Sequence, residues 1–242
     1  MSTKNNSGLS ESVFSLKSDE YHKHYNDSKS RYSKEKQERL RLALKNISSD
    51  TTTNQVIDIG CGTGILLTKL LDEARDVNYV GIDSSDGMLK VAQKNLSQNY
   101  PNVFAEFFSN TLAVGDRKFN YVVSLGVIGY QKNHLKFLYQ LTELSSLGKN
   151  SKIILTCGNG SSLIRKLLDF IQSKRYKNRL MYRHTNSNVL KLWLNEKDLR
   201  ISETRFLLPF LPLLPVMYRG NNRIIQMFYM TQFLVVANVN DQ

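Results

Sequence analysis

The sequence predicts an α/β fold: a doubly wound, mostly parallel seven-stranded sheet that ends in an antiparallel C-terminal edge hairpin. Three observations lead to this prediction. From Gln55 onwards, short β-branched apolar runs alternate with segments of helical apolar spacing, which favours parallel strands joined by crossover helices. Glycines at alternate positions, Gly60, Gly62 and Gly64, follow the first of these runs. The 242 residues, 41% of them hydrophobic, are enough for one domain with appendages.

The first strand and the turn after it predict a ligand cradle. Val56, Ile57 and Ile59 form an apolar run that suits a strand buried on both faces. Glycine is needed where the backbone reaches positive φ, or where a Cβ would occupy the space of a ligand. The apolar residues after the turn recur at helical spacing, so the loop opens a helix whose free N–H groups face the same crevice.

The other elements follow from the same patterns. An amphipathic helix with Ser33 as its N-cap is expected to pack on the sheet through Leu40, Leu44 and Ile47. We expect strands at 55–60, 78–83, 103–109, 120–127 and 152–158, helices at 64–74, 86–97 and 133–147, and edge strands near 201–208 and 229–239.

The motif around the glycines identifies a family. The pattern Asp58-x-Gly60-x-Gly62-x-Gly64, followed by Gly81-Ile82-Asp83, resembles the class I S-adenosylmethionine-dependent methyltransferases, which have a Rossmann-like fold. The segment GIDSSDGMLKVAQKN is similar to the second strand and helix of that family. A dinucleotide fingerprint would instead need a third glycine where Ile65 stands. The resemblance covers residues 55–160 well and the rest loosely. It also implies that Asn195 caps the last crossover helix, which would be short in this chain.

The resemblance implies S-adenosyl-L-methionine as cofactor and S-adenosyl-L-homocysteine as product. The glycine loop would hold the methionine portion, and Asp83 would accept hydrogen bonds from both ribose hydroxyls, a role that suits an acceptor-only carboxylate. Asn110 would bond the adenine amino group, Thr111 would lie along the ring, and Met88 would pack on its face or belong to the core. The expected cofactor-binding set is Asp58, Gly60, Cys61, Gly62, Gly64, Asp83, Ser84, Met88, Asn110, Thr111 and Leu125.

Residues for the chemistry are expected after the fourth strand and near the N-terminus. Methyl transfer from a sulfonium is an in-line displacement, so the protein mainly supplies alignment and exclusion of water. His134 has the side chain to deprotonate a hydroxyl at neutral pH, unless it is a surface residue at a helix start. Tyr130 is a candidate for positioning the acceptor. Tyr25 lies on a segment that folds over the cofactor as a lid in similar enzymes, or it is a packing residue.

Composition divides the chain into regions. Residues 1–18 are expected to be a disordered tail, and residues 19–242 a single domain: 19–54 the lid and first helix, 55–160 the cofactor-binding core, 161–225 a basic substrate-specificity insertion and edge loop. The net charge is +12, and residues 161–225 hold thirteen basic and four acidic residues, which leaves +9 in that stretch. This stretch is either a solvated surface or one that faces an acidic or phosphorylated partner.

The sequence also bears on localisation. The two cysteines form neither a disulfide framework nor a metal site, and no apolar leader precedes Phe14, so we expect a cytoplasmic protein without a metal. The apolar stretch Phe206 to Tyr218 contains three prolines and is too short to span a membrane. It is either core or a surface that contacts the inner face of an anionic membrane.

Three functions remain open at this point. The first is methyl transfer to oxygen or nitrogen of a small-molecule, sugar-phosphate or lipid-linked acceptor. The second is RNA methylation, which the basic stretch supports. The third is a non-catalytic module that keeps the fold for binding, against which the intact Asp58, glycine loop and Asp83 argue. The chain has no Asn/Asp-Pro-Pro-aromatic motif and no cysteine placed as a nucleophile, which disfavours methylation of exocyclic amines of bases or of cytosine C5.

Overall fold

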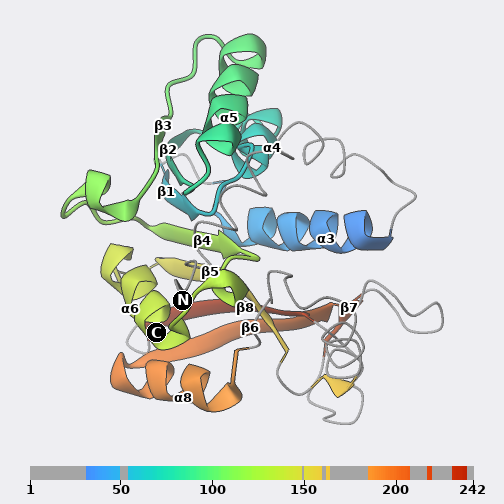
Figure 1. Ribbon diagram of the computed structural model, residues 1–242, viewed down its shortest axis with the longest axis vertical. Coiled ribbons are helices and arrows are strands. Elements are labelled where there is room, and N and C mark those ends of the chain that lie inside the picture. Colours follow the sequence, from blue (N-terminus) through green and yellow to red (C-terminus); the bar gives the residue numbers. More distant parts are fainter. Residues whose placement is uncertain are drawn as a thin grey trace, which may run out of the picture.

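The computed structural model describes residues 31–49, 54–148, 150–159, 162–163, 185–207, 217–219 and 231–238. Within these ranges eight strands form one sheet in the order β3-β2-β1-β4-β5-β8-β6-β7 (Figure 1). Their bounds are β1 Asn54–Ile59, β2 Val77–Ile82, β3 Glu106–Phe108, β4 Tyr121–Leu125, β5 Lys152–Gly158, β6 Leu199–Leu207, β7 Met217–Tyr218 and β8 Thr231–Asn238.

The pairing confirms the predicted fold class. Strands β1 to β5 pair in parallel with their neighbours, and β8 is antiparallel to both β5 and β6. The two-residue strand β7 adds to the outer edge of β6 and was not predicted. Asp58 is opposite Gly81 on one side and Val123 on the other, so the carboxyl ends of β1, β2 and β4 lie at one edge. The strand order reverses between β1 and β4, where ligands bind in open α/β sheets.

Helices cover both faces of the sheet. Helices α3 and α4 pack on one face and α6 and α8 on the other, around two separate apolar clusters (Figure 1). Trp193 of α8 is fully buried and donates from Nε1 to Thr142 Oγ1 of α6 at 2.8 Å. The helices are α3 Arg31–Asn46, α4 Ile65–Asp72, α5 Asp86–Asn99, α6 His134–Leu144 and α8 Ser187–Glu196, with short 3₁₀ helices η1 Thr111–Val114 and η2 Ile128–Tyr130.

Two predicted helix starts are wrong. Ser33 is buried inside α3 and does not precede it. Asn195 lies in the last turn of α8, whose N-cap is Asn186, with its side chain accepting from Asn188 N at 2.9 Å. Because Leu190 and Trp193 are both buried and lie three residues apart, the apolar face of this helix extends further toward the N-terminus than the sequence pattern suggested.

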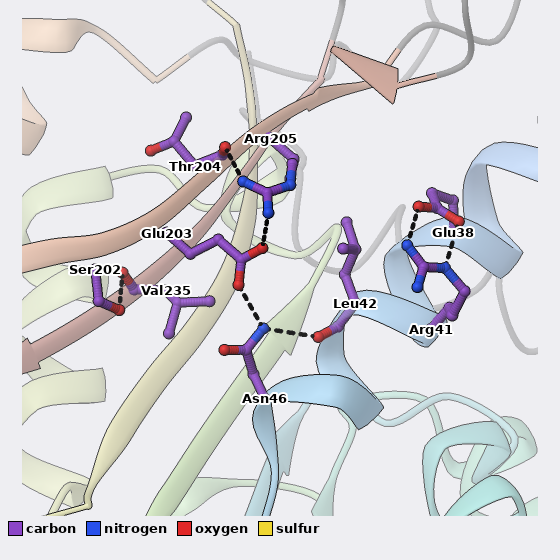
Figure 2. A network of polar contacts seen from close by, with 9 residues as sticks. All are labelled: Glu38, Arg41, Leu42, Asn46, Ser202, Glu203, Thr204, Arg205 and Val235. Carbon is purple, nitrogen blue, oxygen red and sulfur yellow. Dashed lines mark hydrogen bonds and ion pairs between the residues drawn. The ribbon is translucent and has the colours of Figure 1, made fainter. Parts of the chain in front are cut away.

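Polar contacts fasten α3 to the far strand of the edge hairpin. Figure 2 shows Asn46 Nδ2 donating to Leu42 O at 3.0 Å and to Glu203 Oε2 at 2.9 Å. The other carboxylate oxygen of Glu203 pairs with Arg205 Nη2 at 2.5 Å. Glu203 follows a bulge at Ser202, where the register of β6 against β8 shifts, and a bulge re-aims the side chains next to it. The C-terminal half of α3 is therefore held over the sheet.

Several expectations lie outside the described residues. These are the disordered tail, Tyr25 with its proposed lid, most of the basic stretch 161–225, and the centre of the apolar stretch Phe206 to Tyr218. The edge strands predicted near 201–208 and 229–239 are described as β6 and β8 and are confirmed within one or two residues.

Candidate functional site

The glycine loop forms a tight turn between β1 and α4. Gly60, Gly62 and Gly64 have φ of 80°, 55° and 75°, a region that glycine enters without the penalty that a Cβ imposes. Gly60 N and Cys61 N both donate to Ile82 O, at 2.7 and 3.0 Å. These bonds tie the loop to the carboxyl end of β2.

Gly60 and Gly64 have the expected positive φ, and the space that a Cβ would enter is occupied by the protein itself. A Cβ on Gly60 would overlap Val127 Cγ2, and a Cβ on Gly64 would come within 3.2 Å of Ala92 Cβ. Both glycines are therefore explained by positive φ and by close packing on the protein itself, without any ligand. Through Val127 the loop after β4 reaches the glycine loop.

Asp83 connects the glycine loop to the start of α5. Its Oδ2 accepts from Gly62 N at 2.9 Å and its Oδ1 accepts from Ser85 N at 2.9 Å. Ser85 is the N-cap of α5 and accepts from Met88 N at 3.3 Å. Burial raises the pKa of Asp83, and the two backbone hydrogen bonds oppose that rise. A carboxylate has about four lone-pair sites, so roughly two remain for a ligand.

The side chain of Asp58 is buried in the protein. It is 4% exposed and accepts from Tyr79 Oη at 2.8 Å. Burial raises the pKa of Asp58 to about 7; the charge of Asp83 adds to the rise and the Tyr79 hydrogen bond opposes it. Cys61 is buried as well, and burial raises the pKa of its thiol well above the usual value. The one hydrogen bond shown for the Asp58 side chain among the described residues therefore joins the end of β1 to β2.

Thr63 is a candidate for the site that the sequence reasoning missed. It lies in the glycine loop, is 1% exposed, and its Oγ1 has no hydrogen-bond partner in the part of the chain that the structure describes. An unsatisfied buried hydroxyl costs about 1–3 kcal/mol. A ligand with a polar group at this loop would remove that cost. The only sequence signal was a hydroxyl residue between two of the motif glycines.

The third loop brings the predicted adenine-side residues near Asp83. Asp83 N donates to Phe108 O at 3.1 Å, which joins the end of β3 to the second loop. Asn110 follows two residues later and caps η1, accepting from Leu112 N at 3.0 Å. Thr111 is half-buried; Ser84, beside Asp83, is exposed. Met88 of α5 is buried, which fits both of its proposed roles.

The loop after β4 carries the predicted acceptor-side residues. Leu125 ends β4 and is half-buried, and Tyr130 is exposed at the end of η2. His134 is the first residue of α6 and is half-buried, with Asn133 as the N-cap before it. β4 is the neighbour of β1, so this loop and the glycine loop leave the sheet at the same edge. The roles of His134 and Tyr130 stay predictions.

Comparisons with known proteins bear on the family and the fold. The sequence model of the family described as "Methyltransferase domain" matches residues 28–204. An uncharacterized methyltransferase of Staphylococcus carnosus is 28% identical over 151 residues, which are 62% of this chain and 63% of that protein. Ribosomal RNA small subunit methyltransferase C of Buchnera aphidicola is 33% identical over 84 residues, 34% of this chain and 24% of that protein. The aligned segments therefore span less than two thirds of these curated relatives.

The fold also has a solved counterpart of nearly the same extent. The crystal structure of magnesium protoporphyrin IX methyltransferase from Synechocystis PCC 6803 with bound S-adenosylhomocysteine superposes with a TM-score of 0.71. It covers 96% of this chain and 99% of that one at 17% identity. At this identity the likeness concerns the fold alone.

Proposed function

The chain belongs to the methyltransferase domain family, a class of S-adenosylmethionine-dependent enzymes, and from this premise we propose that it methylates a small molecule. The acceptor atom is an oxygen or nitrogen of a small-molecule, sugar-phosphate or lipid-linked compound, and the product of the donor is S-adenosylhomocysteine. The observation that carries the donor half is Asp83, whose two backbone hydrogen bonds fix it between the glycine loop and α5.

The residues present fit the cofactor. Asp83 has acceptor sites left for the two ribose hydroxyls. The buried Thr63 hydroxyl, which has no hydrogen-bond partner among the described residues, lies in the loop assigned to the methionine portion. Asn110 and Met88 are assigned to the adenine. The cofactor supplies an activated methyl group on a sulfonium. The chain holds and orients it and keeps water out; for a hydroxyl acceptor, His134 at the start of α6 takes the proton, with Tyr130 or Tyr25 as alternatives.

The experiment has two arms. Calorimetry with S-adenosylhomocysteine tests the donor site, and incubation of the purified full chain with methyl-labelled cofactor and fractionated cell extract tests the acceptor. We expect saturable binding and label in the small-molecule or lipid fraction. Absence of cofactor binding would overturn the donor assignment, whereas label in protein alone would overturn the acceptor class.

RNA is the second candidate acceptor. The +9 over residues 161–225 and the similarity to a ribosomal RNA methyltransferase over 84 residues favour it, because phosphate contacts by Lys and Arg dominate RNA affinity. Label that enters the RNA fraction, together with steep salt dependence of RNA binding, would replace the small-molecule assignment.

Contact with a membrane surface is the remaining part of the proposal. Among the described helices, none combines the length and the apolar character of a membrane span. The composition of 161–225, cationic with the apolar stretch Phe206 to Tyr218, supports peripheral contact with anionic lipid at the inner face of the membrane. Co-sedimentation with anionic but not neutral vesicles at low salt is the expected result. Equal sedimentation with both, or with neither, would contradict it.

A further inference from the structure

Two carboxyl groups lie at the ends of adjacent strands on the donor side. Asp58 is the last residue but one of β1, and Asp83 directly follows β2. The two strands pair in parallel with Asp58 opposite Gly81, so both carboxyl groups are at the same edge of the sheet. They interact, because the charge of Asp83 raises the pKa of Asp58. We call these two residues the donor-site carboxyl pair.

The other titratable groups around the donor-site carboxyl pair are acids as well. Tyr79 Oη donates to Asp58 Oδ2 at 2.8 Å, and Cys61 lies in the loop that follows β1. Burial is the main cause that raises the pKa of Tyr79 and of the Cys61 thiol, and the charges of Asp58 and Asp83 add to both shifts. Both side chains are therefore neutral at pH 7, and neither offsets the charge of the pair.

Among the described residues, the elements packed around Asp58 bring no cation to it. Its neighbour on β4 is Val123, and the buried residues of α4 are leucines. On α3, Arg39 Nη1 approaches Gly126 in the loop after β4. The one charge that shifts the pKa of Asp58 is that of Asp83. The buried charged residues of α3 are not among the causes of this shift: Glu35, Lys36 and Arg39.

Protons take the place of the missing counter-charge. Burial raises the pKa of Asp58 to about 7, whereas an exposed aspartate has a pKa of about 4. Near neutral pH this carboxyl is therefore protonated in part of the molecules. Burial raises the pKa of Asp83 too, against its two backbone hydrogen bonds. A ligand that brings a positive charge to this place would favour the ionised carboxylates and displace the proton.

A second observation marks the same loop as a place for a ligand. Thr63 is buried in the glycine loop, and its Oγ1 has no hydrogen-bond partner in the described part of the chain. This loop is assigned to the methionine portion of the cofactor, and that portion changes its charge in the reaction. The donor has a sulfonium, whereas the product S-adenosylhomocysteine has an uncharged thioether. The ribose hydroxyls assigned to Asp83 bring no charge.

We infer that the donor-site carboxyl pair recognises the charge of the cofactor: Asp58 releases a proton to the solvent when the sulfonium donor binds, and takes one up when the thioether product remains. The inference rests on the proposed donor site and deepens it, because it gives Asp58 a role in telling donor from product. Two carboxylates stabilise a cation more than a neutral group, so the preference for the donor grows as the pH rises. Asp58 needs no contact with the cofactor for this role, because Coulomb interactions in a buried site decline slowly with distance.

The test is calorimetry of the full chain with the donor and with the product, each in two buffers that differ in ionisation enthalpy. The difference in observed heat between the buffers gives the number of protons released on binding. Because the pKa of Asp58 is about 7, donor binding should release about 0.9 proton at pH 6 and about 0.5 at pH 7. The donor affinity should then rise about fivefold between these pH values, and the product affinity by no more than about twofold.

Two variants should change the proton count in opposite directions. Asp58→Asn removes the titrating group, so this release should vanish; protons that the ligand itself exchanges are common to both proteins and cancel in the comparison. Tyr79→Phe removes the hydrogen bond that lowers the pKa of Asp58, so the release at pH 7 should rise toward about one proton. A structural role alone would alter affinity or melting temperature without this opposite change. If Asp58→Asn does not fold, Tyr79→Phe decides.

The matched control is Asp86→Asn, which removes the same charge from an exposed position in the first turn of α5. It should leave the proton count within about 0.1, since an exposed charge is screened by salt. Sinefungin, in which a protonated amine replaces the sulfonium, should behave like the donor and so separates the charge from the methyl group.

The outcomes distinguish the inference from the donor site on which it rests. The inference is wrong, although the donor site stands, if the unaltered chain and Asp58→Asn release equal numbers of protons or if Tyr79→Phe leaves the count unchanged. The same holds if donor and product share one pH dependence, or if sinefungin behaves like the product. If the unaltered chain binds none of the three compounds, the donor site itself is refuted and the inference with it.

Discussion

Replacing Asp83 by Asn is the sharpest test of the donor site. In the structure both carboxylate oxygens already accept a backbone N–H, one from Gly62 and one from Ser85. Asn keeps one acceptor oxygen and puts an amide donor in place of the other. The variant therefore loses the charge, one loop anchor and one acceptor for the ribose. A hydrogen bond to a charged group contributes about 1.5–3 kcal/mol, so the affinity for S-adenosylhomocysteine should fall roughly 10- to 150-fold.

The assay must separate lost ligand contact from a displaced loop. Calorimetry gives the affinity, and thermal unfolding without ligand reports the loop anchor. Asp86→Asn is the matched control, because Asp86 is an exposed carboxylate in the first turn of α5. It removes the same charge three residues away and should change the cofactor affinity by no more than about twofold. If Asp83→Asn binds within threefold of the unaltered chain while its melting temperature is preserved, Asp83 does not hold the ribose.

Three further predictions follow. Gly60→Ala should lower the free energy of unfolding by about 2 kcal/mol or more from positive φ and overlap with Val127, and adding Val127→Ala should restore part of it; denaturant unfolding that shows no recovery would contradict this. Asp58, with its pKa raised to about 7 from about 4, keeps a proton in the folded state that the unfolded chain releases. Its contribution to stability is therefore present below about pH 4 and is lost as the pH rises to about 7, and the stability difference from Asp58→Asn should change over that range, whereas a flat difference would refute the shift. His134→Ala should slow turnover about 100- to 10,000-fold at unchanged cofactor affinity; a slowing below threefold would move the base to Tyr130 or Tyr25, or indicate an amine acceptor.

Most of the fold was predictable because its signals are local. The alternation of β-branched runs with segments of helical spacing can be read directly from the sequence. It predicted the five parallel strands and the edge hairpin, all of which the structure contains. The errors concern boundaries, which depend on tertiary contacts. The start of α8 after its N-cap Asn186 follows from the burial of Leu190 and Trp193 against α6, a tertiary contact that the local pattern around Asn195 does not show.

Some residues of the candidate site could be found from the sequence, and others only from the structure. The glycine turn and Asp83 could be found because their chemistry requires a short, fixed spacing. Thr63 could not be assigned, because a hydroxyl in a loop becomes informative only when its burial and missing partner are known. The close packing of Gly60 on Val127 involves residues of two loops, and the close approach of Arg39 to Gly126 involves a helix and a loop. Such contacts between distant segments leave no periodic trace in the sequence.

These contacts differ in kind between the predicted donor side and the predicted acceptor side of the site. The donor half is held by backbone hydrogen bonds among the ends of β1, β2 and β3, so its shape depends little on side chains outside the motif. The predicted acceptor side includes the loop after β4, which packs on the glycine loop through Val127 and on α3 through Arg39. α3 is in turn bound to β6 through the hydrogen bond from Asn46 to Glu203, so the position of this loop depends on side chains from segments that are distant in the sequence.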